Sequence, residues 1–99
     1  MRIDVSARNM ELTDAIDQYA QQKSEKLPRY YDGVERIEVV LEHSSNETFS
    51  TEFRVDVEKH DTFVSHAEGD SVYKTIDLAS DKMTRQLTDF KEKLRNSKR

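Results

Sequence analysis

A chain of 99 residues is long enough for one domain with a modest hydrophobic core and too short for several. Its 16 basic and 20 acidic residues give a net charge of −4, and the lack of cysteine excludes disulfides, thiolate metal sites and a cysteine nucleophile. The chain is polar but periodic, so we expect it to be folded. No apolar run reaches transmembrane length and no signal-peptide pattern is present, which predicts a cytoplasmic protein without a membrane partner.

The first predicted elements are a strand and a helix. Residues 1–7 alternate between apolar and polar side chains, which is typical of a half-buried strand. Thr13 is a favourable N-cap, and the helix after it is expected to end near Leu27 because Pro28 disfavours helical backbone at the residue before it. Apolar residues recur at helical spacing at Leu12, Ile16, Tyr19, Ala20 and Leu27.

Three consecutive strands are predicted next. Residues 34–43 alternate, a polar connection at 44–47 leads into a strand that ends at Val57, and a last strand covers 62–68. Connections of hairpin length make these strands antiparallel. The expected inner residues are Ile37, Val39, Leu41, Phe49, Phe53, Val55, Val57, Phe63, Ser65 and Ala67. The small residues of the last strand leave room for a helix to lie close.

The longest predicted element is an amphipathic helix over residues 71–95, with Ser71 as its cap. Its apolar stripe is expected to be buried and consists of Val72, Ile76, Ala79, Met83, Leu87, Phe90 and Leu94. The element order predicts an α+β, two-layer β-α-β-β-β-α sandwich: a four-stranded sheet with both helices on one face, as in double-stranded-RNA-binding modules. We expect residues 1–95 to form one domain and 96–99 a short, basic, flexible tail.

No convincing catalytic or metal site is found in the sequence. His43, His60 and His66 lack ligand-like spacing and are interpreted as surface imidazoles. Asp77 and Asp81 lie one helical turn apart, where the nearby lysines are expected to pair with them. We therefore predict neither an enzyme nor a protein that uses a metal, a cofactor or a small-molecule substrate.

Basic residues gather toward the C-terminus. Residues 82–99 contain seven Lys/Arg and two Asp/Glu, a net charge of +5, whereas residues 1–81 carry −9. Such asymmetry favours a polyanionic partner, although a merely solvated basic helix is the commoner case. Two helices side by side would let these cations line a shared groove for phosphates. The candidate RNA-binding residues are Lys23, Lys26, Arg29, Lys74, Lys82, Arg85, Lys91 and Lys93. Tyr30 and Tyr31 either stack on bases or cover the core.

Three segments resemble the ribosome hibernation-promoting factor family, which includes the ribosome-associated inhibitor and the older sigma-factor modulation proteins. They are LTDAIDQYAQQKSEKLPRYYD (12–32), HAEGDSVYKTID (66–77) and SDKMTRQLTDFKEKL (80–94), of which the last is the most specific. The resemblance spans nearly the whole chain and is to the short type, without the additional C-terminal dimerisation domain. Ser71 stands where the family usually has Asp, and Ser24 where a larger apolar residue is common.

The resemblance implies a β-α-β-β-β-α protein that binds the small ribosomal subunit and its RNA. Such a protein occupies the channel of messenger and transfer RNA near the decoding centre, silences idle ribosomes and often promotes their pairing into inactive dimers. The family's basic residues match Lys23, Lys26, Lys82, Arg85, Lys91 and Lys93. We expect the free protein to be monomeric. A second hypothesis stays open, a protein-interaction module that regulates transcription through an acidic sheet face.

Overall fold

The computed structural model describes residues 1–44 and 47–96. Its elements are β1 (Arg2–Arg8), α1 (Asp14–Lys26), a short 3₁₀ helix η1 (Leu27–Arg29), β2 (Val34–Ser44), β3 (Thr48–Val57), β4 (Phe63–Gly69) and α2 (Val72–Asn96). This order confirms the predicted β-α-β-β-β-α arrangement. The Thr13 hydroxyl accepts a hydrogen bond from the Ile16 amide at 3.2 Å, as expected of an N-cap. Pro28 ends α1 as predicted, because the chain tightens into η1 around it.

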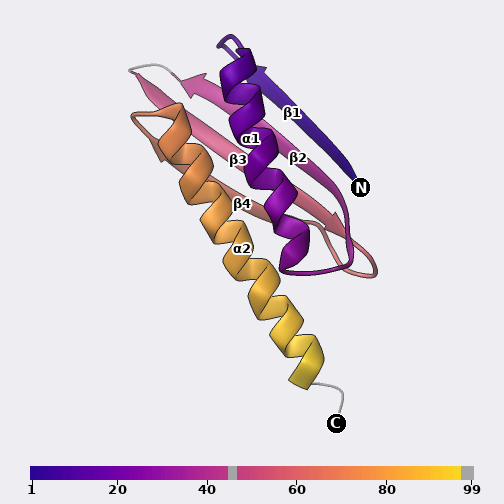
Figure 1. Ribbon diagram of the computed structural model, residues 1–99. Coiled ribbons are helices and arrows are strands. Elements are labelled where there is room, and N and C mark those ends of the chain that lie inside the picture. Colours follow the sequence, from indigo (N-terminus) through magenta and orange to yellow (C-terminus); the bar gives the residue numbers. More distant parts are fainter. Residues whose placement is uncertain (45–46, 97–99) are drawn as a thin grey trace.

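The four strands form one sheet in the order β1-β2-β3-β4. β1 runs parallel to β2 and is joined to it through α1, whereas β2, β3 and β4 are antiparallel neighbours. Both helices cover the same face of this sheet (Figure 1), with α1 over β1 and α2 across β3 and β4. The α+β two-layer sandwich predicted from the sequence is confirmed.

The core lies between the two helices and the inner face of the sheet. The predicted inner residues of β2 and most of those of β3 are buried, and Phe53 and Ile37 are fully enclosed. Thr51 was missed because a threonine in a strand does not signal burial by its type. Its hydroxyl is hydrogen-bonded to that of Thr75 on α2 at 2.9 Å. Burial of this pair is tolerated because each hydroxyl has a partner.

Small residues on β4 let α2 approach the sheet closely, as the sequence predicted. Ser65 and Ala67 are both buried, and the Ser65 hydroxyl donates to the Ala79 carbonyl at 2.7 Å. Ser24 on α1 plays a similar part, because its buried hydroxyl donates to the Ala20 carbonyl at 2.8 Å. A serine therefore fills a closely packed position without leaving a polar group unpaired.

The buried stripe of α2 ends earlier than the periodicity predicts. Met83 and Leu87 are fully buried, but Leu94 is 38% exposed, and all of residues 91–96 are exposed. A 25-residue helix is about 37 Å long. A seven-residue strand such as β4 covers only about 23 Å. The last turns of α2 therefore project past the end of the sheet (Figure 1).

The predicted tail begins at Asn96, which is the last residue of α2. The rest of the tail, 97–99, lies outside the described residues. Positions 45–46 of the predicted hairpin connection lie outside them too. Neither helix of the described chain has the length and apolarity needed to cross a membrane.

Candidate nucleic-acid interface

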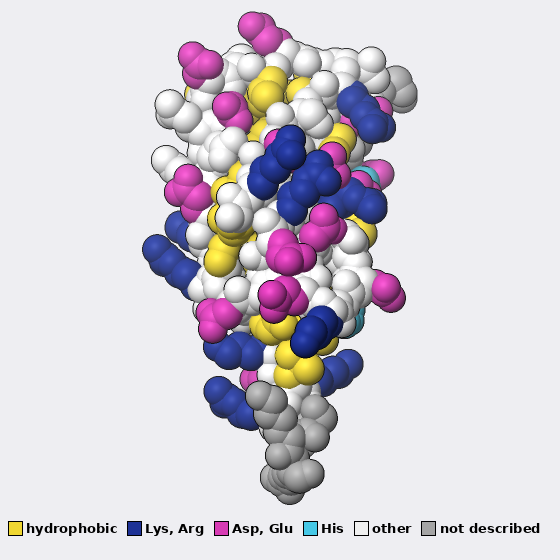
Figure 2. Space-filling model, turned by 90° about the vertical axis from the view of Figure 1, so that its right-hand side faces the viewer, with side chains coloured by type: hydrophobic (Ala, Val, Ile, Leu, Met, Phe, Trp, Pro, Cys, Tyr) yellow, Lys and Arg dark blue, Asp and Glu magenta, His cyan; other side chains and the backbone are white. Residues whose placement is uncertain are grey.

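The candidate RNA-binding cations do not line one groove between the helices, so that prediction is wrong. Lys23 lies in the seam between α1 and α2. Lys82 and Lys93 lie on the flank of α2 that faces β4, where their neighbours are His66 and Phe63. Lys91 lies on the opposite flank, beside Tyr31 and Asp32. A helix displays side chains in all directions once it leaves the sheet, and in Figure 2 blue side chains project on both sides of the tapering lower end.

Lys23 is held by an acidic residue of the other helix. Its ammonium lies 3.2 Å from an Asp77 carboxylate oxygen, and the Tyr19 hydroxyl donates to the same oxygen at 2.5 Å. The ammonium also lies 5.5 Å from the centre of the Tyr19 ring. The hydrogen bonds to Asp77 raise the pKa of Lys23 and the pKa of Tyr19. These three residues tie α1 to α2.

This seam corrects the ion pairs expected within α2. Asp77 was expected to pair with Lys74 or Lys82, but it pairs with Lys23 across the helices. Lys74 instead approaches Asp70 at 3.7 Å, one turn earlier. Side-chain spacing along one helix cannot reveal a partner that tertiary packing brings from another helix.

The seam predicts a loss of stability at alkaline pH. The pKa of Tyr19 lies above its ordinary value of 10.0 and that of Lys23 above 10.5 in the folded state. Both groups therefore stabilise the fold fully below their unfolded values and lose that contribution as the pH rises through the raised ones. Urea unfolding between pH 8 and 11.5 should show the decline. Asp77→Asn should flatten it, and an equally steep decline in that variant would exclude the seam as its cause.

Lys82 has a structural partner as well. Its ammonium donates to the His66 carbonyl of β4 at 2.7 Å, and one turn later the Gln86 amide donates to the Val64 carbonyl at 2.9 Å. β4 is an edge strand, whose outward carbonyls have no neighbouring strand to bond. These two side chains of α2 therefore cover the open edge of β4.

The remaining candidates are better placed to receive an external anion. Within the described residues, no ion pair involves Lys26, Arg29, Arg85, Lys91 or Lys93, and all five are exposed. A cation that no carboxylate holds in an ion pair meets a phosphate without first breaking such a pair. Among the described residues, three of the eight candidates thus have an internal partner and five have none.

The two tyrosines after η1 have different surroundings. The Tyr31 ring makes an edge contact with Phe90, with ring centres 5.2 Å apart, so it covers the end of the core. Tyr30 is 38% exposed. The alternative of core cover is therefore observed for Tyr31.

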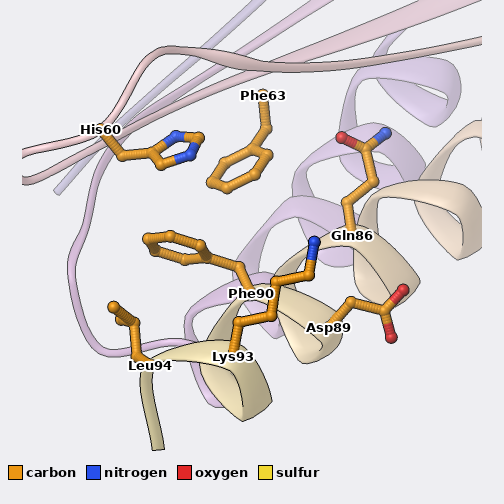
Figure 3. Close-up of a pocket in the computed structure, with 7 residues that line it drawn as sticks. All are labelled: His60, Phe63, Gln86, Asp89, Phe90, Lys93 and Leu94. Atoms are coloured by element: carbon orange, nitrogen blue, oxygen red, sulfur yellow. The ribbon is translucent and has the colours of Figure 1, made fainter. Parts of the chain in front are cut away.

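An aromatic pocket at the β3–β4 turn was not foreseen from the sequence. His60 stacks on Phe63 with ring centres 4.5 Å apart and lies 4.4 Å from the ring centre of Phe90 (Figure 3). The pocket has a volume of about 530 Å³ and is completed by Gln86, Asp89, Lys93 and Leu94. His60 is exposed, as expected of a surface imidazole, but its contact with two phenylalanines depends on a meeting of β4 and α2 that no local pattern encodes.

The outer face of the sheet is less acidic than predicted. Asp4 accepts from Arg36 at 3.2 Å, and Arg54 lies 3.8 Å from both Glu38 and Glu52. Partial burial would by itself raise the pKa of Asp4, but the hydrogen bonds from Arg36 and Arg2 outweigh it and lower that pKa. Among the described strand residues, this face carries four arginines and six carboxylates, so it is of mixed charge.

No group of three His, Asp or Glu side chains in the described part of the chain is arranged to hold a metal ion. The three histidines lie apart, and His43 stacks on Phe49 at the other end of β3 from His60.

Known proteins share both the sequence and the fold of this chain. Residues 3–95 match the family model described as "Sigma 54 modulation protein / S30EA ribosomal protein". The ribosome hibernation promoting factor of Escherichia coli is 33% identical over 95 residues, which cover 96% of this chain and 98% of that protein. The factor of the same name from Azotobacter vinelandii is 30% identical over 96 residues, which cover 94% of this chain and 85% of that protein.

Two solved structures agree with these sequence matches. The N-terminal domain of Thermus thermophilus Protein Y has a TM-score of 0.81 and 33% identity, over 91% of this chain and 99% of that one. A ribosomal subunit interface protein from Coxiella burnetii has a TM-score of 0.83 and 22% identity, over 93% of this chain and 99% of that one. This likeness supports the fold. With a family model that covers almost every residue, the chain belongs to the Sigma 54 modulation protein / S30EA ribosomal protein family.

Proposed function

We propose that this protein binds the ribosome and keeps it inactive, as a hibernation factor. The observation that carries the proposal is the basic C-terminal half of α2, whose last turns project beyond the sheet (Figure 1). Arg85, Lys91 and Lys93 of this half are exposed and have no ion pairs in the described part of the chain. Relatives matched over nearly their full length are named ribosome hibernation promoting factors, which supports the same conclusion. Binding of this kind takes place in the cytoplasm.

The proposed contact is with RNA of the small ribosomal subunit. Phosphate recognition requires distributed positive charge rather than a fixed set of residues, and a helix with cations on both flanks meets that need in a channel with RNA on several sides. The protein inhibits by occupying the channel of messenger and transfer RNA, so no turnover chemistry is needed. Residues 1–81 carry a net charge of −9 and residues 82–99 carry +5, and this asymmetry orients the protein with the C-terminal end of α2 toward the RNA. Pairing of inactive ribosomes is a further consequence that this occupancy favours.

Co-sedimentation with purified small subunits tests this proposal. The protein should sediment with them at low salt, and the logarithm of its affinity should fall linearly with the logarithm of salt concentration, by about 0.7–0.9 per neutralised phosphate. In vitro translation should be inhibited over the same range of protein concentration. Absence from the subunit fraction at low salt would refute the proposal. The same result would favour the alternative function, a protein-docking module that regulates transcription through its sheet face.

A further inference from the structure

The aromatic pocket at the β3–β4 turn presents three rings at the surface. Its wall consists of three planar rings, His60 from the turn, Phe63 from the edge strand β4 and Phe90 from α2. His60 is exposed and Phe63 and Phe90 are half-buried, so solvent reaches the rings. The volume of about 530 Å³ accommodates a flat heterocycle together with part of its sugar.

The polar rim of the pocket suits a phosphate beside that heterocycle. Figure 3 shows the Lys93 side chain rising along the pocket, with its nitrogen toward the space between Phe63 and Gln86, whereas the Asp89 carboxylate points away from the rings. Lys93 has no ion pair among the described residues, and Arg85 is exposed on the same flank of α2. Aromatic rings next to free cations are the combination with which proteins bind unstacked bases of single-stranded nucleic acid.

We propose that this pocket binds one unstacked base of an RNA strand, with Lys93 on an adjacent phosphate. The inference rests on the proposed ribosome binding and extends it, because it adds a base contact to an interface that otherwise requires only phosphates. A base stacks through its face and needs no defined hydrogen bonds, so the pocket accepts any base and favours purines through their larger rings.

The chain supplies a matched control for this pocket. His43 stacks on Phe49 with ring centres 4.5 Å apart, almost the geometry of His60 on Phe63, and Phe49 is half-buried as Phe63 is. This second pair lies at the opposite end of β3, far along the sheet from the projecting end of α2. His60→Ala and His43→Ala therefore remove the same kind of ring contact, one inside the pocket and one away from it.

The test compares a ten-nucleotide single-stranded RNA with a ribose-phosphate chain of equal length that lacks bases. Aromatic NMR signals of His60, Phe63 and Phe90 should shift on addition of the RNA and stay unchanged with the chain that lacks bases. Signals of His43 and Phe49 should not move with either. His60→Ala should weaken binding of the RNA, and of small subunits, by roughly five- to a hundredfold, the range of one lost base–aromatic stack. His43→Ala should leave both affinities unchanged.

Two results would overturn the base-binding proposal while leaving ribosome binding intact. In one, the wild type co-sediments with small subunits, yet the pocket signals ignore the RNA and His60→Ala binds subunits normally. In the other, His60→Ala weakens subunit binding although the RNA never shifts the pocket signals, which would mean that a protein side chain of the ribosome fills the pocket. Failure of the wild type to bind subunits at all is a separate result, which refutes the proposed function.

Discussion

Leu87→Ala is expected to lower the free energy of unfolding by about 2–5 kcal/mol, because it removes a fully enclosed side chain and leaves a cavity. Leu87 lies on the last turn of α2 that is buried against the core before the helix leaves the sheet. Little of the surrounding structure can collapse into the gap, since α2 is fixed to β4 nearby by Lys82 and Gln86. Equilibrium unfolding in urea, monitored by circular dichroism, measures the loss.

Leu78→Ala is the matched control, because it makes the same substitution in the same helix at a side chain that is 50% exposed. A surface change of this kind typically alters stability by about 0.5 kcal/mol or less. If the two variants unfolded at the same urea concentration, the assignment of the buried face of α2 would be wrong.

Periodicity in the sequence was sufficient to predict the elements and their inner faces. Alternation in β2 placed Ile37, Val39 and Leu41 inward, and all three are fully buried. The spacing of Ile76, Met83 and Leu87 likewise gave the buried side of α2. These predictions succeed because burial of one face is what selects such patterns, so the pattern and the fold have the same cause.

The end of the buried stripe could not be predicted in this way. Leu94 continues the apolar spacing of α2, but it is 38% exposed because the sheet has ended by then. The periodicity of a helix says which side is apolar and carries no information on the length of the strands beneath it. The same limit applies to the parallel pairing of β1 with β2, which follows from the path of α1 across the sheet.

The candidate site was predicted as a set of residue types and only partly as an arrangement. Lys23, Lys74 and Lys82 were grouped with the other cations, yet each has an internal acceptor, at Asp77, Asp70 and the His66 carbonyl. Those acceptors come from another helix, from a preceding turn and from an edge strand. Which lysine remains available to a phosphate thus depends on tertiary contacts, and the sequence shows only that a lysine is present.

Replacing Arg85 and Lys91 together by glutamine is expected to weaken binding to small ribosomal subunits by about a hundredfold or more. Each side chain is exposed on a different flank of α2, so the double variant removes phosphate contacts on both sides of the helix. A hydrogen bond to a charged group contributes about 1.5–3 kcal/mol, and about 1.4 kcal/mol corresponds to tenfold in affinity. The slope of the logarithm of affinity against the logarithm of salt concentration should also decrease in magnitude, by about 1.4–1.8 for two lost phosphate contacts. Co-sedimentation at several salt concentrations would detect this change.

The control is Arg36→Gln with Arg54→Gln, which changes the net charge of the protein by the same amount on the outer face of the sheet. Neutralisation is preferable to reversal there, because both arginines lie beside Asp4, Glu38 or Glu52 and an introduced carboxylate would be repelled. Exposed ion pairs of this kind contribute at most about 1 kcal/mol, so the control should stay folded, and a thermal melt verifies this.

A localised interface on α2 requires that only the helix variant lose binding. Equal losses in the two variants would show that net charge, rather than the basic end of α2, governs binding. A loss of binding confined to the sheet variant would place the contact on the outer face of the sheet. It would favour a protein partner, because Arg36 and Arg54 already have carboxylate neighbours and are poorly placed to meet phosphates.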